Sequence, residues 1–170
     1  MERRSFREKI GMRMRGAYSS MHRRFNAHFL QFGATADQFV LLTLLAEQDG
    51  ITQQELVRRA YSDANTVTAM LALLERQKLI RRTRDDHDLR VRLVHLTAKG
   101  RSFQEKLDRR AEGLHRRLRN ALPASQRRGL LKALQRIAEV MGSHANGSRE
   151  PAANTGSGRS PRRGRALKEK

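Results

Sequence analysis

The stretch from Thr52 to Gly100 constrains the fold of this chain more than any other part of it. It begins with two short segments that have apolar residues at helical spacing and are separated by a tight turn. Two strand-like segments follow, LIRRTR and RVRLVHLT, joined by the charged loop DDHDL. Thr52 and Glu55 have the spacing of a capping box at the start of the first helix. This order predicts a pair of packed helices with a basic hairpin beside it.

The second helix of the pair has two distinct faces. Its inward face carries apolar residues at intervals of three and four: Val67, Met70, Leu71 and Leu74. Its outward face carries short, mostly uncharged residues: Asn65, Thr66, Thr68, Ala69 and Ala72. Short side chains allow a helix backbone to approach another surface closely. The element order and this face predict a winged helix-turn-helix, whose second helix enters a DNA groove.

Amphipathic helices are predicted on both sides of this segment. A long apolar stripe runs from Ser5 to Gln31, a dense apolar helix spans Thr35 to Gln48, and two further helices follow, separated by Pro123. The fold class expected is mainly α with a small β-hairpin. The expected organisation is an N-terminal dimerisation helix at 5–34, the winged helix-turn-helix at 35–100, C-terminal dimerisation helices at 101–142, and a disordered basic tail at 143–170.

The charge balance points to a polyanionic partner. The chain has 36 Lys and Arg against 17 Asp and Glu, a formal net charge of +19. The segment from Ser143 onward holds seven Lys or Arg and two Glu, so +14 of this charge belongs to residues 1–142. Nucleic acid is the first candidate because neutralised phosphates release counterions, and a membrane surface is the second. The low aromatic content does not suggest a single-strand stacking platform.

Several classes of function are disfavoured by what the sequence does not contain. The chain has no cysteine, so disulfides, zinc-thiolate sites and thiol catalysis are excluded for it. Its six histidines lack metal-binding spacings, and there is no phosphate loop or nucleophile elbow. No apolar run reaches the roughly 20 residues that span a bilayer, and the first residues lack a signal-peptide core. We therefore expect a cytoplasmic protein that is not an enzyme and has no metal, cofactor or membrane partner.

The helix pair ITQQELVRRAYSDANTVTAMLALLERQKLI and the wing DDHDLRVRLVHLTAKG resemble the MarR family of bacterial transcription regulators. The D-x-R and L-T-x-x-G elements of that family fall at Asp88, Arg90, Leu96, Thr97 and Gly100. The resemblance extends over about residues 6 to 142. It implies a homodimer that binds double-stranded DNA at a pseudo-palindromic operator, acts as a repressor and is released by a small-molecule effector. The chain departs from the family pattern at Lys78, where a helix-ending Gly is usual, and at Ala72 and Leu73, where Asp and Arg are frequent.

The resemblance also implies roles for individual residues. In the major groove, Asn65 would bond to adenine, and Thr66, Thr68 and Ala69 would face thymine methyl groups or phosphates. At the wing tip, Arg90 would enter the minor groove, with Asp88 orienting it through a salt bridge. Phosphate contacts are expected from Gln54, Ser62, Arg81, Arg82 and Arg84. The bland alternative is a helix cap at Asn65 and an exposed ion pair of little energetic value in the hairpin.

Other interpretations remain open at this stage. Four phenylalanines, Phe25, Phe29, Phe32 and Phe39, lie near the junction where the family often holds a small aromatic effector, although core packing is the favoured role. The alternative function is a winged-helix module that binds DNA without reading its sequence, as an architectural or protein-interaction protein. A basic RNA-binding protein is a third interpretation.

Overall fold

The computed structural model describes residues 9–86 and 88–142 of the chain. These residues belong to two compact units, one ending at Ala121 and the other beginning at Leu122. Two expectations lie outside the described residues: the first turn of the N-terminal helix at residues 5–8 and the basic tail at residues 143–170. Each unit is described separately below.

The elements of the structure are mainly helical, as the sequence predicts. In chain order they are α1 (Ile10–Leu30), α2 (Ala36–Glu47), β1 (Ile51–Thr52), α3 (Gln53–Arg59), α4 (Ala64–Arg76), β2 (Ile80–Arg84), β3 (Arg92–Leu96), α5 (Ala98–Asn120) and α6 (Ala124–Gly142). Helix α5 begins at Ala98, so it starts inside the segment that the sequence assigns to the winged unit. None of the helices along the described residues is both long and apolar enough to cross a lipid bilayer.

The first unit is organised around one apolar core to which five helices and the sheet contribute. Its fully buried side chains include Phe29, Leu41, Leu42, Leu45, Leu56, Leu71, Leu74, Val94 and Leu107. Phe29 of α1 and Phe39 of α2 lie with their ring centroids 4.4 Å apart, which joins the N-terminal helix to the winged unit. Phe25 and Phe32 are partly buried against the same core. The core-packing role favoured for these phenylalanines is therefore confirmed.

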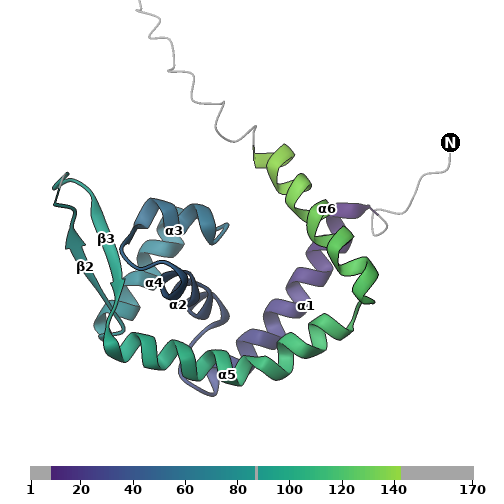
Figure 1. Ribbon diagram of the computed structural model, residues 1–170, viewed down its shortest axis with the longest axis horizontal. Helices are drawn as coiled ribbons and strands as arrows, with labels where there is room; N and C mark the ends of the chain where they lie inside the picture. The colour runs from purple at the N-terminus through teal and green to yellow at the C-terminus, as the bar shows by residue number, and fades with distance from the viewer. Residues whose placement is uncertain (1–8, 87, 143–170) are drawn as a thin grey trace, which may run out of the picture. The chain divides into compact units, whose positions relative to one another are not determined.

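The sheet has three antiparallel strands in the order β1-β3-β2, whereas the sequence predicts only a two-stranded hairpin. The hairpin pairs Ile80 with Leu96, and the short strand β1 adds to the other edge of β3 by pairing Ile51 with Val94. A two-residue strand has no periodicity of its own, so no local pattern could identify it. In Figure 1, β2 and β3 project from the helices as a single arm.

Polar side chains fix where the helices begin. Thr35 and Gln38 form a reciprocal capping box at α2, and Asp63 caps α4 by accepting from the Thr66 amide at 2.9 Å. At α3, Thr52 accepts from the Glu55 amide, but the Glu55 carboxylate bonds Arg58 and Arg59 instead of reaching back to Thr52. The capping box predicted there is therefore only half formed, because two arginines compete for its carboxylate.

The end of α4 and the start of α5 meet at a close backbone contact. Lys78 adopts a left-handed conformation, φ 59°, and the amides of Lys78 and Leu79 bond the carbonyls of Glu75 and Leu74. These are the two bonds of a Schellman motif, so the lysine ends the helix regularly despite its departure from the family pattern. The Thr97 hydroxyl donates to the Lys78 carbonyl at 2.8 Å, and Gly100 lies directly against the backbone of Leu79.

The second unit contains helix α6, none of whose residues is buried. Its apolar residues are nevertheless spaced as one helical stripe. The exposed ones are Leu130, Leu131, Leu134, Val140 and Met141. Leu131 and Met141 are 67% and 69% exposed. Such a stripe is typical of a helix that packs against another chain.

Candidate nucleic-acid interface

The outward face of α4 is the first part of the candidate interface. Asn65, Thr66, Thr68 and Ala69 are all exposed, while Val67, Leu71 and Leu74 on the opposite face are buried. The inward and outward faces predicted from the sequence are therefore confirmed. Because α4 begins at Ala64, Asn65 and Thr66 lie in its first turn, where a recognition helix contacts base edges.

The hydrogen bonds within this face distinguish its members. The Thr68 hydroxyl donates to the Ala64 carbonyl at 2.6 Å and accepts from Gln53 Nε2 at 2.5 Å. Hydrogen bonds from the side chain and the amide of Thr66 lower the pKa of Asp63. The side chain of Asn65 makes no hydrogen bond to the other residues that the structure describes. The side-chain amide of Asn65 is thus available to a base edge, whereas Thr66 and Thr68 offer mainly their methyl groups.

Gln53 was not anticipated from the sequence. Its side chain crosses from the first residue of α3 to Thr68 on α4 and so ties the two helices of the motif together at their exposed side. Gln54 beside it is exposed, and Ser62 in the turn is half-buried. A helix-start glutamine carries no recognisable signal, because only the packing of the two helices brings it to Thr68.

The wing tip is organised by hydrogen bonds from backbone amides to aspartate side chains. The Arg90 amide donates to Asp88 Oδ1 at 2.9 Å, and the Asp88 amide donates to Asp85 Oδ1 at 3.0 Å. Asp88 thus holds the backbone of Arg90, in place of the salt bridge to its guanidinium that the sequence suggests. Arg90 is exposed at the tip. Its side chain is left to extend away from the protein.

The basic residues of the wing fall into two groups. Arg81 and Arg84 on β2 are exposed, as phosphate-contacting residues must be. The side chain of Arg82 is only 18% exposed, and its Nε lies 3.3 Å from Glu75 Oε2 on α4. Arg82 therefore connects the wing to α4. This ion pair joins residues that the sequence places in different elements.

A polar network at the base of the wing was also not anticipated from the sequence. Asp49, just after α2, accepts hydrogen bonds from the Leu96 amide at 2.8 Å and from His95 Nδ1 at 3.1 Å. The other ring nitrogen of His95 lies 2.9 Å from the Thr83 hydroxyl. Burial opposes ionisation of Asp49, but the bonds from Leu96 and His95 outweigh it and lower its pKa. The network fixes both strands of the wing to the end of α2.

Helix α3 carries a compact charge cluster. Arg58 and Arg59 both bond the Glu55 carboxylate, and these hydrogen bonds, led by that of Arg58, lower the pKa of Glu55 to about 2. The carboxylate thus stays ionised at neutral pH and offsets part of the positive charge of the helix. Arg58 remains well exposed despite this bond.

A cavity of about 230 Å³ lies between α1, α2 and α5. Its wall is mostly aromatic and aliphatic, including Phe25, Phe29, Phe39, Val40 and Leu118. Polar side chains also line it, among them His22, Asp37 and His115. His22 Nε2 lies 3.1 Å from Asp37 Oδ1. The His115 ring meets Phe25 edge-on with centroids 5.3 Å apart, and its Nε2 is buried without a hydrogen-bond partner in the structure.

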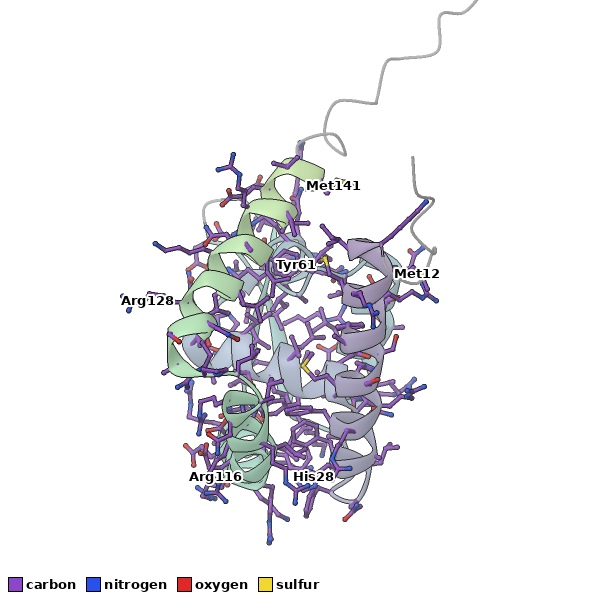
Figure 2. The ribbon with its side chains drawn as sticks, turned by 90° about the vertical axis from the view of Figure 1, so that its right-hand side faces the viewer. Met12, His28, Tyr61, Arg116, Arg128 and Met141 are labelled. Atoms are coloured by element: carbon purple, nitrogen blue, oxygen red, sulfur yellow. The ribbon has the colours of Figure 1, made fainter. Side chains whose placement is uncertain are left out.

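Helices α1 and α5, which flank this cavity, also contact each other beyond it. His28 Nε2 on α1 lies 2.9 Å from the Arg110 carbonyl on α5, and the Arg110 guanidinium stacks on Phe32. Figure 2 labels His28 and Arg116 on these two helices, with side chains filling the space between them. Among the described residues, no three His, Asp or Glu side chains gather as a metal site.

Comparison with known proteins shows which family the winged unit matches. The MarR family model matches residues 34–91, which cover the winged unit up to the start of β3. The chain is 31% identical to the HTH-type transcriptional regulator TtmR of Methylorubrum extorquens, over 71% of this chain and 60% of TtmR. It is 32% identical to the HTH-type regulator YdgJ of Bacillus subtilis, over 62% of this chain and 64% of YdgJ. The chain thus spans somewhat under two thirds of these relatives.

Solved structures share the fold over most of the chain. The Bordetella bronchiseptica protein BpsR, whose DNA binding is regulated by 6-hydroxynicotinic acid, matches with a TM-score of 0.74 and 27% identity, over 81% of this chain and 98% of BpsR. The transcriptional repressor CouR, solved on a 23-mer DNA duplex, matches with a TM-score of 0.70 and 28% identity, over 81% and 99%. The winged unit therefore matches the MarR family model, and the chain shares its fold with solved DNA-binding regulators.

Proposed function

We propose that this protein is a sequence-specific regulator that binds double-stranded DNA as a homodimer and acts as a repressor in the cytoplasm. The observation that carries the proposal is one compact unit with two complementary exposed features. These are the short-side-chain face of α4, led by Asn65, and the arginine at the wing tip, Arg90. A helix that can approach a base edge and a cation beside it match the major and minor grooves respectively. CouR, a repressor at 28% identity, binds duplex DNA.

The direct test is selection of bound sequences from a random duplex pool at physiological salt. We expect enrichment of a pseudo-palindrome with half-sites roughly 10 base pairs apart. Competition against unrelated duplex and structured RNA then measures specificity. Equal affinity for all duplexes would contradict sequence reading and leave a non-specific architectural DNA binder. A preference for the RNA would reject the DNA function.

Arg90→Ala is expected to weaken binding to the selected duplex by about 10-fold. The variant removes the guanidinium, and with it the attraction to the negative potential of a narrow minor groove. The slope of log affinity against log salt should fall by about one charge. Fluorescence anisotropy over a salt series measures both quantities. Arg109→Ala, which removes the same charge from the exposed side of α5, should leave the slope unchanged. An unchanged salt slope for Arg90→Ala would show that the wing tip does not contact the DNA.

The homodimer is supported by apolar side chains that are exposed on each unit. Tyr18 and Met21 of α1 and Leu131 and Met141 of α6 are exposed, together with the other apolar residues of the α6 stripe. Exposed apolar surface on this scale is costly for a monomer and is ordinarily buried between chains. A two-fold dimer also presents two α4 helices to two half-sites of a palindrome.

Regulation by a small aromatic acid is the second part of the proposal. The observation that favours it is the apolar cavity with one buried, unpartnered nitrogen, His115 Nε2. A planar ring fits the aromatic wall, and an acceptor oxygen on that ring would satisfy the histidine. BpsR, at 27% identity, responds to 6-hydroxynicotinic acid.

Added 6-hydroxynicotinic acid should raise the melting temperature of the protein, because a ligand that binds only the folded state stabilises it. The same compound should release the protein from its selected duplex. His115→Phe keeps the aromatic shape and removes the nitrogen, so the variant should fold but lose the thermal shift. Differential scanning fluorimetry measures the effect. If none of a panel of aromatic acids shifts the wild-type protein, the cavity is a packing defect and no effector site.

A further inference from the structure

The turn between α3 and α4 contains a tyrosine in an unusual conformation. Tyr61 has φ 50°, in the left-handed region that favours glycine, and its residue surface is 86% exposed. A bulky side chain is rare at such a position because its Cβ crowds the following carbonyl. Tyr61 is labelled in Figure 2. It is not part of the apolar core, so burial does not compensate for its backbone strain.

The hydrogen bonds of the turn do not require a tyrosine. The Tyr61 amide donates to the Arg58 carbonyl at 3.3 Å, and the Ser62 amide donates to the Val57 carbonyl at 3.2 Å. Both bonds come from the backbone, so glycine would make them without strain. Asp63 caps α4 independently of Tyr61. The fold alone therefore gives no reason for this side chain, and residues held in strained conformations are characteristic of functional sites.

The place of the turn in the motif indicates what the side chain meets. In a bound helix-turn-helix, the first helix crosses the phosphate backbone and the start of the second contacts base edges. The turn that joins them therefore lies over the phosphates at the edge of the groove. Arg58 lies next to Tyr61, since its carbonyl accepts the hydrogen bond from the Tyr61 amide. Its pKa is raised, chiefly by its hydrogen bond to Glu55 and to a lesser extent by Tyr61.

We propose that Tyr61 is a DNA-contacting residue whose hydroxyl donates a hydrogen bond to a phosphate oxygen beside the groove that α4 enters. Arg58, exposed next to it, adds a positive charge to the same contact. The proposal rests on the DNA-binding function proposed above. Tyrosine hydroxyls are common phosphate donors, and such contacts set the register of a protein on the duplex.

Three variants test this contact. Tyr61→Phe removes only the hydroxyl and should lower affinity for the selected duplex by about 3- to 10-fold, with an unchanged salt slope because no charge is lost. Tyr61→Gly removes the strain and the side chain together. It should raise the melting temperature by roughly 2–4 °C while lowering affinity at least as much as Tyr61→Phe. This opposite movement of stability and affinity is the signature of the proposal.

Lys78→Gly is the matched control, because Lys78 has the same left-handed conformation at the end of α4. It should raise the melting temperature similarly and leave affinity within about twofold. Any further loss of affinity that comes from the missing lysine charge is recognised by a lower salt slope. Wild-type affinity in both Tyr61 variants would overturn the proposal. If the wild-type protein itself prefers no duplex, the proposed function fails instead, so the two failures are distinguishable.

Discussion

Gly100→Ala is expected to destabilise the fold by about 3 kcal/mol and to lower the melting temperature by roughly 6–12 °C. A Cβ at this position would lie 1.8 Å from the Leu79 carbonyl oxygen and 2.8 Å from its carbon. Both atoms belong to the backbone, so no side chain can rotate away. The same carbonyl accepts hydrogen bonds from the Thr97 amide and hydroxyl, so moving it also disturbs the start of α5. Thermal and urea denaturation measure the loss.

Gly113→Ala provides a control on the same helix. No atom lies within 4 Å of a Cβ built at Gly113, and the residue is exposed in the middle of α5. Alanine should therefore stabilise the helix by up to about 1 kcal/mol. The two glycines should thus respond with opposite signs. Equal stabilities for Gly100→Ala and the wild-type protein would show that α5 does not approach Leu79 as closely as the structure places it.

Leu131→Glu is expected to convert the proposed homodimer to a monomer and to lower affinity for the selected duplex by about 100-fold. Leu131 is exposed near the centre of the α6 stripe, and a carboxylate there would be buried without a partner in the dimer. Each winged helix-turn-helix would then bind its half-site alone, without the gain in affinity that comes from linkage to the second copy of the chain. Size-exclusion chromatography with light scattering measures the mass. Helix content by circular dichroism should persist, since α6 contributes no buried residue.

Ser125→Glu controls for the added charge. Ser125 is exposed in the first turn of α6, on the side of the helix opposite Leu134 of the stripe, and gains the same single negative charge. It should remain a dimer with nearly wild-type affinity. A dimer that survives Leu131→Glu at low micromolar concentration would place the interface elsewhere. Monomers from both variants would show that charge alone controls association.

Residues close in the sequence account for what could be predicted. The faces of α4, the N-cap Thr52 and the hairpin follow from spacing and capping patterns that span a few residues. The exposed α6 stripe follows from the same periodicity. These features depend on the geometry of one helix or one turn, so local sequence determines them.

Contacts between distant segments account for the rest. The Asp49 and His95 bond joins residues 46 positions apart, and β1 exists only because β3 offers it an edge. The Thr68 hydroxyl accepts its hydrogen bond from Gln53, which lies on another helix. No short window of sequence contains both partners of such contacts.

The resemblance to the MarR family, the order of the helices and of the hairpin strands, and the outward face of α4 follow from the sequence, because each depends on local spacing. How the candidate site is divided depends on contacts between distant elements. The tertiary structure assigned Arg82 to an ion pair with Glu75, left Arg90 exposed, and placed the strained Tyr61 beside Arg58. Which polar groups remain available to a partner depends on which neighbours packing brings within hydrogen-bond distance, and that is a property of the folded chain.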